Sequence, residues 1–318
     1  MDGSGGADVA RVVVEHKTTS ADITPGSPYW RRLTLDAQVS LYLGGAGSLL
    51  YDVIRKPTLR PLRATPPEAR RYTKAGKLYA AQREHDETPD AYEARLLADI
   101  AQHPDAYYQR GTVVRTEEEA REAGRDVWMT ARMIRESRYL DAWPRNPSAC
   151  DAYGRTCDYW PVCSGTASID DDVLYRDAGA QHEELPGVRH SLPLLTSSSL
   201  STYRACPRRY LYSYERRRRP IATAHALTFG TLIHAGLEVW WSTLDVDAAL
   251  VAVSAAKDPY DAATARALIA GYHARWADEP LTVVGVERVW TRPLLNPTTG
   301  AASKSFELAG KIDAEVDQ

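Results

Sequence analysis

The pattern of apolar and polar positions predicts strands near both ends of the chain. Residues 9–19, VARVVVEHKTT, combine a β-branched run with charged and hydroxyl residues that follow it, which is typical of a strand leaving a core. Residues 282–291 and 304–317 have the same character, and the turn-forming NPTTG lies between them. The pattern therefore predicts one early strand and a late pair, separated by most of the chain.

Most of the intervening sequence is predicted to be helical. Leu35, Val39 and Leu43 recur every four residues, which indicates a helix with one apolar face. Such spacing, Ala-rich charged composition and N-cap residues such as Thr116 predict helices over 33–47, 66–84, 88–103, 116–140, 197–214, 223–243 and 245–276. A further strand is expected at 107–115. Residues 164–195 show no clear period, and we interpret most of them as a linker.

Composition limits the environment of the protein. The chain has 318 residues, of which 44% are hydrophobic, enough for one large domain or two small ones. We expect no membrane span and no signal peptide, so a cytoplasmic setting is predicted. The net charge of −3 gives no general attraction to nucleic acid, so contact with DNA requires a local patch. Arg216 to Arg219 is one candidate, and a solvated helix end is the alternative.

Four cysteines form an unusual set. Cys150, Cys157 and Cys163 lie close together in sequence, and Cys206 stands apart. In a reducing compartment such residues are more often metal ligands or free thiols than disulfides. Four thiolates suit a tetrahedral zinc ion or an iron–sulfur cluster. The wide spacing within the first three disfavours paired zinc knuckles, and free buried thiols remain the alternative.

Two charged motifs lie on the predicted end strands. Glu15 and Lys17 share one face of the first strand, because residues two apart on a strand point the same way. Such a pair is usually a surface ion pair. Asp313 lies in the last predicted strand, three residues after Gly310. It is either a metal ligand or one of several acids, with Glu315 and Asp317, that alternate along the strand and face solvent. Neither motif is specific by itself.

Taken together, six motifs resemble the PD-(D/E)XK nuclease superfamily, specifically its RecB/AddB-like branch with an iron–sulfur cluster. The motifs are Cys206, Gly230-x-x-x-His234, Gly310-x-x-Asp313, Glu15-x-Lys17, Gln38-x-x-x-Tyr42 and the three clustered cysteines. The resemblance covers most of the chain. Its motifs stand in circularly permuted order, because the last three of the family order occur first here.

The resemblance implies a mixed α/β fold, with a restriction-endonuclease-like central mixed β-sheet flanked by helices. A helical insertion and a cysteine-ligated cluster are expected on it. Residues 1–164 would form the C-terminal half of the nuclease fold, 165–196 a linker, and 197–318 the N-terminal half, together one domain. The rotated order also predicts that residues 306–317 pair antiparallel with residues 9–18 within one molecule or across a domain-swapped dimer.

The same resemblance assigns roles to single residues. Asp313, Glu15 and His234, with the backbone carbonyl of His16, would hold Mg²⁺ or Mn²⁺, and Lys17 would position the attacking water. Gln38 and Tyr42 would contact the DNA strand. Cys150, Cys157, Cys163 and Cys206 would ligate a [4Fe–4S] cluster. The plainer alternatives are a core or surface histidine at 234 and a simple helix surface pair at 38 and 42.

The expected activity is hydrolysis of DNA by a metal-dependent exonuclease that acts on single strands or duplex ends. The implied setting is recombination, repair or phage DNA processing, with a helicase or recombination protein as a partner. A non-catalytic DNA-binding module is the alternative. The sequence holds no G-x-x-x-x-G-K-[ST] motif, so we predict no built-in ATP motor.

Overall fold

A computed structural model describes residues 11–43, 47–152, 154–185, 187–222 and 225–317. Residues 9–10 of the predicted first strand and residues 44–46 of the predicted first helix lie outside the described residues. The helices of the described part are each too short or too polar to traverse a lipid bilayer.

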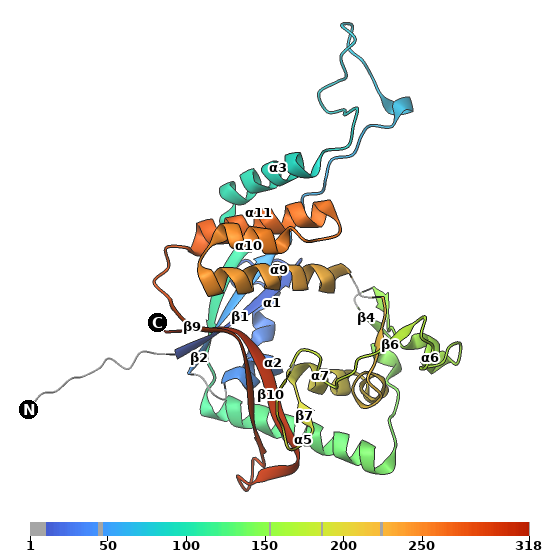
Figure 1. The fold of residues 1–318 in the computed structure, drawn as a ribbon, viewed down its shortest axis with the longest axis vertical. Helices are drawn as coiled ribbons and strands as arrows, with labels where there is room; N and C mark the ends of the chain where they lie inside the picture. The colour runs from blue at the N-terminus through green and yellow to red at the C-terminus, as the bar shows by residue number, and fades with distance from the viewer. Residues whose placement is uncertain (1–10, 44–46, 153, 186, 223–224, 318) are drawn as a thin grey trace, which may run out of the picture.

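A six-stranded mixed sheet forms the centre of the molecule (Figure 1). Its strands are β1 (Arg11–Thr19), β2 (Ser48–Arg55), β3 (Tyr108–Val113), β7 (Leu194–Leu195), β9 (Thr282–Leu295) and β10 (Ala302–Asp317). They follow the order β3-β2-β1-β10-β7, and β9 also pairs with β10. β1 runs parallel to β2 and antiparallel to β10. The mixed sheet flanked by helices agrees with the predicted fold class.

The long strand β10 joins the two parts of the sheet. β9 pairs with it antiparallel over most of its length. β1 pairs with residues 314–317 of β10, and β7 pairs with residues 307–308. The stretch 309–313, which includes Asp313, therefore lies between the partners β1 and β7. The first and last described strands thus lie side by side in one chain, which confirms the expected pairing for Arg11 to Val14.

One face of the sheet is covered by a layer of helices. The layer contains α3 (Pro89–Gln102), α4 (Pro104–Tyr107), α9 (His225–Thr243), α10 (Val246–Val253) and α11 (Pro259–Trp276). Val12 and Val14 of β1 and Ala314 of β10 pack into this layer against Ile233 and Leu237 of α9. The alternating side chains of β1 explain the contact, because every second residue faces α9.

The other face packs against α1 (Pro28–Arg31), the 3₁₀ turn η1 (Arg32–Leu35) and α2 (Ala37–Leu43). Farther along, α5 (Glu117–Leu140) and α7 (Ser197–Ala205) pack on the ends of β9 and β10. Thr116 and Glu119 form a capping box at the start of α5, which confirms the predicted N-cap. The α5 helix leads into the cysteine-bearing loop, so it places that loop beside α7.

A small lobe carries the cysteines. It contains η3 (Pro147–Ala149), β4 (Asp151–Ala152), β5 (Arg155–Thr156), α6 (Trp160–Ser164), β6 (Tyr175–Asp177), α8 (Pro207–Tyr210), the π-helical turn η4 (Leu211–Glu215) and β8 (Arg218–Pro220). Tyr159, Tyr175 and Tyr212 form its core with Ile169. Tyr203, Tyr210 and Tyr214 are also buried, so they pack the helices around Cys206.

Several predicted elements need correction. Residues 66–84 contain only the short 3₁₀ turn η2 (Pro67–Ala69) and a bridge between Tyr72 and Leu78, because Pro66 and Pro67 oppose a helix and no apolar face recurs. The predicted 33–47 helix begins as 3₁₀ and becomes α-helical at Ala37. The predicted 245–276 helix divides at Ser254 to Asp258 into α10 and α11.

Two further corrections concern the sheet and the cysteine region. β2 was not predicted, because SLLYDVIR is buried on both faces and shows a continuous apolar run instead of alternation. The expected linker 165–196 is largely folded: Tyr175 and Leu194 are buried, and β7 joins the central sheet. Cys206 ends α7 instead of lying within a continuous helix.

Candidate functional site

Asp313 lies where β1 and β10 stop pairing. The recorded ladder ends at Val14 opposite Ala314. Beyond it, the backbone N–H of His16 donates to Asp313 Oδ2 at 2.7 Å, although 297 positions separate the two residues. The side chain of Asp313 thus takes the place of a backbone acceptor and is held beside the Glu15–Lys17 segment. This contact brings the two predicted motifs into one site.

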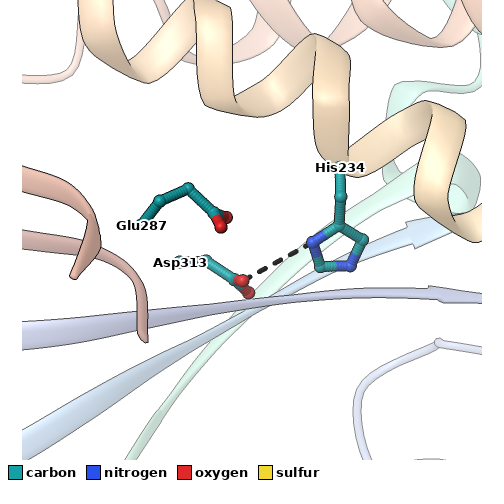
Figure 2. A group of neighbouring side chains, drawn as sticks. All are labelled: His234, Glu287 and Asp313. Carbon is teal, nitrogen blue, oxygen red and sulfur yellow. Dashed lines mark ion pairs between the residues drawn. The ribbon is translucent and has the colours of Figure 1, made fainter. Parts of the chain in front are cut away.

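His234 reaches the same carboxylate from helix α9. Its Nδ1 lies 3.5 Å from Asp313 Oδ1 (Figure 2). Gly230, one turn earlier on α9, lies beside β1: a Cβ there would make an ordinary contact with Thr18 Oγ1 at 3.5 Å. The spacing Gly230-x-x-x-His234 therefore places a small residue and an imidazole on the face of α9 that meets the sheet.

Glu287 completes a three-residue group that the sequence reasoning missed. One potential ligand atom from each of His234, Glu287 and Asp313 lies within 4.8 Å of the other two (Figure 2). Glu287 comes from β9, and the β9–β10 register places it opposite Asp313. Its backbone φ of 53° is left-handed, and its carboxylate pairs with Lys311. A left-handed non-glycine residue inside a strand is rare and is often found at functional sites.

Glu15 and Lys17 form the buried polar part of the site. Their side chains make an ion pair, and Glu15 Oε1 also accepts from Gln38 Nε2 at 2.7 Å. Lys17 Nζ donates to Gln38 Oε1 at 3.1 Å. The Tyr42 hydroxyl accepts from Gln38 and donates to the Lys311 carbonyl at 2.9 Å. Gln38 and Tyr42 thus lie in the site and fix the Glu15–Lys17 pair, and their contact with DNA stays a prediction.

The pKa values of the two central carboxylates, Glu15 and Asp313, are shifted in opposite directions. Burial raises the pKa of Glu15 to about 7, although Lys17 opposes the shift. Burial also acts to raise the pKa of Asp313, but the hydrogen bonds and charges of His234 and His16 outweigh it and lower the pKa to about 2. Asp313 in turn raises the pKa of His234 against the effect of burial. At neutral pH, Asp313 is therefore ionised and Glu15 is close to its midpoint.

The residues fit a divalent cation. Glu15 Oε2 is buried and has no hydrogen-bond partner among the described residues. An unpartnered buried carboxylate oxygen is costly unless a cation or proton satisfies it. Carboxylate oxygens from Asp313 and Glu287 and the His234 imidazole form a separate donor set of the kind that Mg²⁺ or Mn²⁺ accepts, and Glu15 is not part of this group.

The His16 side chain points into a second buried network. Its Nδ1 lies 3.2 Å from Asp52 Oδ2, and Asp52 also contacts Arg110 at 3.3 Å. Tyr272 donates to the same Asp52 carboxylate. This network was not predicted, because Asp52 and Arg110 are 58 positions apart in sequence and meet only through the pairing of β2 with β3. The network holds His16 on the face of β1 opposite to the one that carries Glu15 and Lys17.

An open cleft of about 830 Å³ gives access to the site. Lys17, His234, Glu287 and Asp313 line it, and so does Lys56 at the end of β2. The cleft also holds the small polar residues Thr18, Thr19 and Ser20. His234, Glu287 and Asp313 are therefore reachable from solvent, whereas the buried Glu15 does not line the cleft.

The four cysteines line one separate cavity of about 250 Å³. All four are free thiols of intermediate burial. No three of the described Cys sulfur atoms lie mutually within 4.8 Å. Four ligands of a single zinc ion at about 2.3 Å would place sulfurs closer than this. The cavity brings Cys206 next to Cys150, Cys157 and Cys163, as the sequence predicted.

The arginine run 216–219 is partly engaged within the cysteine lobe. Arg218 pairs with Asp172 at 2.9 Å and donates to the Ile169 carbonyl. Arg219 lies over the Tyr214 ring and 3.8 Å from a Glu183 oxygen. Arg216 and Arg217 are exposed and have no ion pair among the described residues, so their contact with nucleic acid stays a prediction.

Comparison with known proteins gives one match. A model of the PD-(D/E)XK nuclease superfamily matches residues 194–318. No curated protein and no solved structure gives a significant match. The matched stretch contains His234, Glu287 and Asp313, whereas Glu15 and Lys17 lie outside it and reach the site through the pairing of β1 with β10.

Proposed function

We propose that the protein is a metal-dependent DNA nuclease of the PD-(D/E)XK type. The observation that carries the proposal is the meeting of Asp313, within the matched stretch, with Glu15 and Lys17 from the other end of the chain. An acid, an acid–lysine pair and a histidine around one solvent-open cleft suit phosphodiester hydrolysis. A pure binding module has no need of this arrangement.

Asp313, Glu15 and His234 would hold the metal ion with the His16 carbonyl, and Glu287 would add a fourth side chain. When bound, Mg²⁺ or Mn²⁺ supplies positive charge for the phosphate oxygens and lowers the pKa of water. Lys311 neutralises Glu287 in the metal-free protein. In the proposed metal-bound state, the metal ion would replace the Lys311 ammonium as the partner of the Glu287 carboxylate.

Lys17 would stabilise the negative charge that develops during hydrolysis. The Glu15 and Asp313 carboxylates raise the pKa of Lys17 against the effect of burial, so the ammonium is charged at neutral pH. Gln38 holds Lys17 and Glu15 at the same time. The ammonium is therefore positioned before substrate arrives, which is the condition for electrostatic stabilisation of a transition state.

The finer parts of the proposal follow the resemblance. We propose an exonuclease that acts on single strands or duplex ends, in recombination, repair or phage DNA processing, with a helicase or recombination protein as a partner. The antiparallel pairing of β1 with β10 supports a circularly permuted order of the nuclease motifs in one domain. The cleft opens beside β1 and β10, where a strand end would enter.

We also propose that the four cysteines ligate a [4Fe–4S] cluster. The support is that all four cysteines line one cavity of about 250 Å³, and four thiolates are the usual ligands of such a cluster. The cluster would link Cys206, at the end of α7, to the loop that carries the other three ligands. A structural role follows, because this cavity and the cleft at Asp313 have separate linings.

The decisive test compares the protein with Asp313→Asn and Lys17→Met. We expect the unaltered protein to degrade end-labelled DNA with Mn²⁺ or Mg²⁺, and both variants to lose at least about a hundredfold in rate. Calorimetric titration should show weaker Mn²⁺ binding for Asp313→Asn and for Glu287→Gln, whereas Lys17→Met should still bind the ion. A circular substrate reports whether ends are required.

Two outcomes would contradict the proposal. Cleavage that survives Asp313→Asn would place catalysis elsewhere. DNA binding without metal-dependent cleavage by the unaltered protein would favour the non-catalytic binding module. Thermal unfolding of each variant controls for loss of the fold.

A further inference from the structure

A basic arm projects from the helical layer. Residues 60–86, between β2 and α3, extend away from the rest of the protein (Figure 1). This arm contains seven Lys or Arg residues against three Asp or Glu residues, in a chain whose net charge is −3. Long connections without regular structure are uncommon in compact domains and are usually functional or disordered. The arm therefore concentrates positive charge on one projection.

The base of the arm is held in a defined conformation. Glu87, which is 6% exposed, accepts from the Leu62 backbone N–H at 2.9 Å and binds Arg95 with both carboxylate oxygens at 2.8 Å. Arg95 also donates to the Arg60 carbonyl. Asp86 accepts from Ala64 N–H and pairs with Arg63. These contacts join the outgoing and the returning segment of the arm at its base. The base of the arm therefore has a defined structure.

The outer end of the arm is a small turn with free cations. Tyr72 and Leu78 form a bridge, and Thr73 N–H donates to the Lys77 carbonyl at 2.7 Å. Five side chains of the arm are exposed and have no ion pair in the part of the chain that the structure describes: Arg60, Arg71, Lys74, Lys77 and Arg83. They are thus available to an anionic partner.

Two tyrosines lie among these cations. Tyr72 and Tyr79 are each 53% exposed; Tyr72 is one of the two bridge residues, and Tyr79 directly follows the other, Leu78. Aromatic side chains interleaved with basic ones are the combination that binds single-stranded nucleic acid, because bases stack on rings while phosphates contact the cations. A duplex would offer phosphates but few free base faces.

The arm follows a cleft residue closely in the chain. Lys56, which lines the cleft with Asp313 and His234, stands directly after β2 and just before the arm. A strand that leaves the cleft past Lys56 would therefore continue toward the arm. On this geometry we propose that the arm is a single-stranded DNA-binding element that holds substrate outside the catalytic cleft. This inference rests on the proposed nuclease function.

The test measures DNA binding directly on the Asp313→Asn background, which prevents cleavage. The arm variant Arg71→Ala/Lys74→Ala/Lys77→Ala is compared with Arg132→Ala/Arg135→Ala/Lys304→Ala. The control removes the same charge from exposed cations of α5 and β10 that have no ion pair in the described structure. The probe is a labelled oligothymidylate of about 30 nucleotides.

We expect the arm variant to bind about tenfold more weakly, with a log affinity versus log salt slope shallower by about 2, since each lost phosphate contact removes about 0.7. The control should match the parent. Tyr72→Ala/Tyr79→Ala should weaken binding about tenfold and leave the slope unchanged, because stacking releases no counterions. The thermal midpoint should not move in any variant.

An arm variant that binds like the parent, with the same salt slope, would overturn the proposal. An equal loss for an equivalent duplex would overturn the single-strand assignment. Failure of the nuclease proposal is distinguishable: it would appear as arm-dependent binding by an unaltered protein that does not cleave. A cleaving protein whose affinity is independent of the arm would refute the arm alone.

Discussion

At the scale of single residues, the site depends on how Glu15 uses its two carboxylate oxygens. Oε1 is held by Lys17 and Gln38, whereas Oε2 is buried without a partner among the described residues. The raised pKa of about 7 follows from this burial. The metal-free site therefore stores an unfavourable interaction that a proton or a cation relieves.

The raised pKa of Glu15 predicts how the free energy of unfolding changes with pH. The pKa of Glu15 is raised in the folded protein, so the fold binds more protons than the unfolded chain between about pH 4.5 and pH 7. Stability of the metal-free protein should fall as pH rises through that window, by up to about 3 kcal/mol. The raised pKa of His234 acts in the same direction, because its stabilisation is lost as pH rises.

Urea unfolding at pH 5 and pH 8 measures this effect. Glu15→Gln should reduce the difference, and saturating Mn²⁺ should remove or reverse it, since the ion binds the deprotonated ligands of the folded state. Asp313 does not contribute in this window, because its lowered pKa of about 2 acts only in acid. A stability that rises steadily from pH 5 to pH 8 without metal would contradict the expectation.

Individual site residues differed in how well the sequence predicted them. Glu15, Lys17, His234 and Asp313 stood in spaced motifs, and the structure brings them together. Glu287 gave no such signal, because its place opposite Asp313 depends on a hairpin register with irregularities and on a left-handed backbone. Only tertiary structure reveals such a residue.

At the scale of elements, β10 needs a glycine where β9 crosses it closely. A Cβ at Gly310 would lie 2.7 Å from the Trp290 ring, whose neighbours include Tyr42 of the site. A glycine within a strand often marks a close approach, and at Gly310 the approaching group is the Trp290 side chain.

Gly310→Ala should therefore destabilise the protein by about 1–3 kcal/mol, because the indole has to shift within a packed layer. Gly124→Ala is the matched control on α5, where no atom lies within 4 Å of the added methyl group. That variant should stabilise the protein by about 0.5–1 kcal/mol through its helix propensity. Chemical denaturation measures both, and equal effects at the two positions would refute the packing argument.

Elements whose own sequence carries a capping motif or a clear strand pattern were predicted correctly, and elements without such a signal were missed. The α5 helix carries its own capping box, and β1 carries a β-branched run followed by charged and hydroxyl residues. β2 is apolar on both faces, so its sequence lacks a strand period. The arm was predicted as a helix from its charged, Ala-rich composition, although Pro66 and Pro67 interrupt that pattern.

At the scale of the whole molecule, the proposed [4Fe–4S] cluster would couple the cysteine lobe to the central domain. Protein prepared without oxygen should contain iron and absorb broadly in the visible range, and Cys206→Ser should lose iron and unfold more readily. Ser213→Ala, in the core of the same lobe, is a control that should keep the iron. A colourless protein with stoichiometric zinc would contradict the cluster.

The shape of the whole domain was predictable only through long-range pairing. The sequence indicated that the end strands meet, and β1 does pair with β10. It did not indicate that residues 194–195 add a strand to the same edge of β10, because two residues are too short to show a period. The segment expected to be a linker became part of the sheet for this reason.

The contact between His16 and Asp313 joins residues 297 positions apart. The two halves of the site are therefore synthesised at different times. A ribosome releases β1 with Glu15 and Lys17 long before it has made β10. Until then β1 has an unpaired edge, and the half-built centre lacks Asp313. Under the proposed nuclease function, the catalytic centre is therefore incomplete until β10 has been made, and the open edge of β1 is a site for aggregation until β10 covers it.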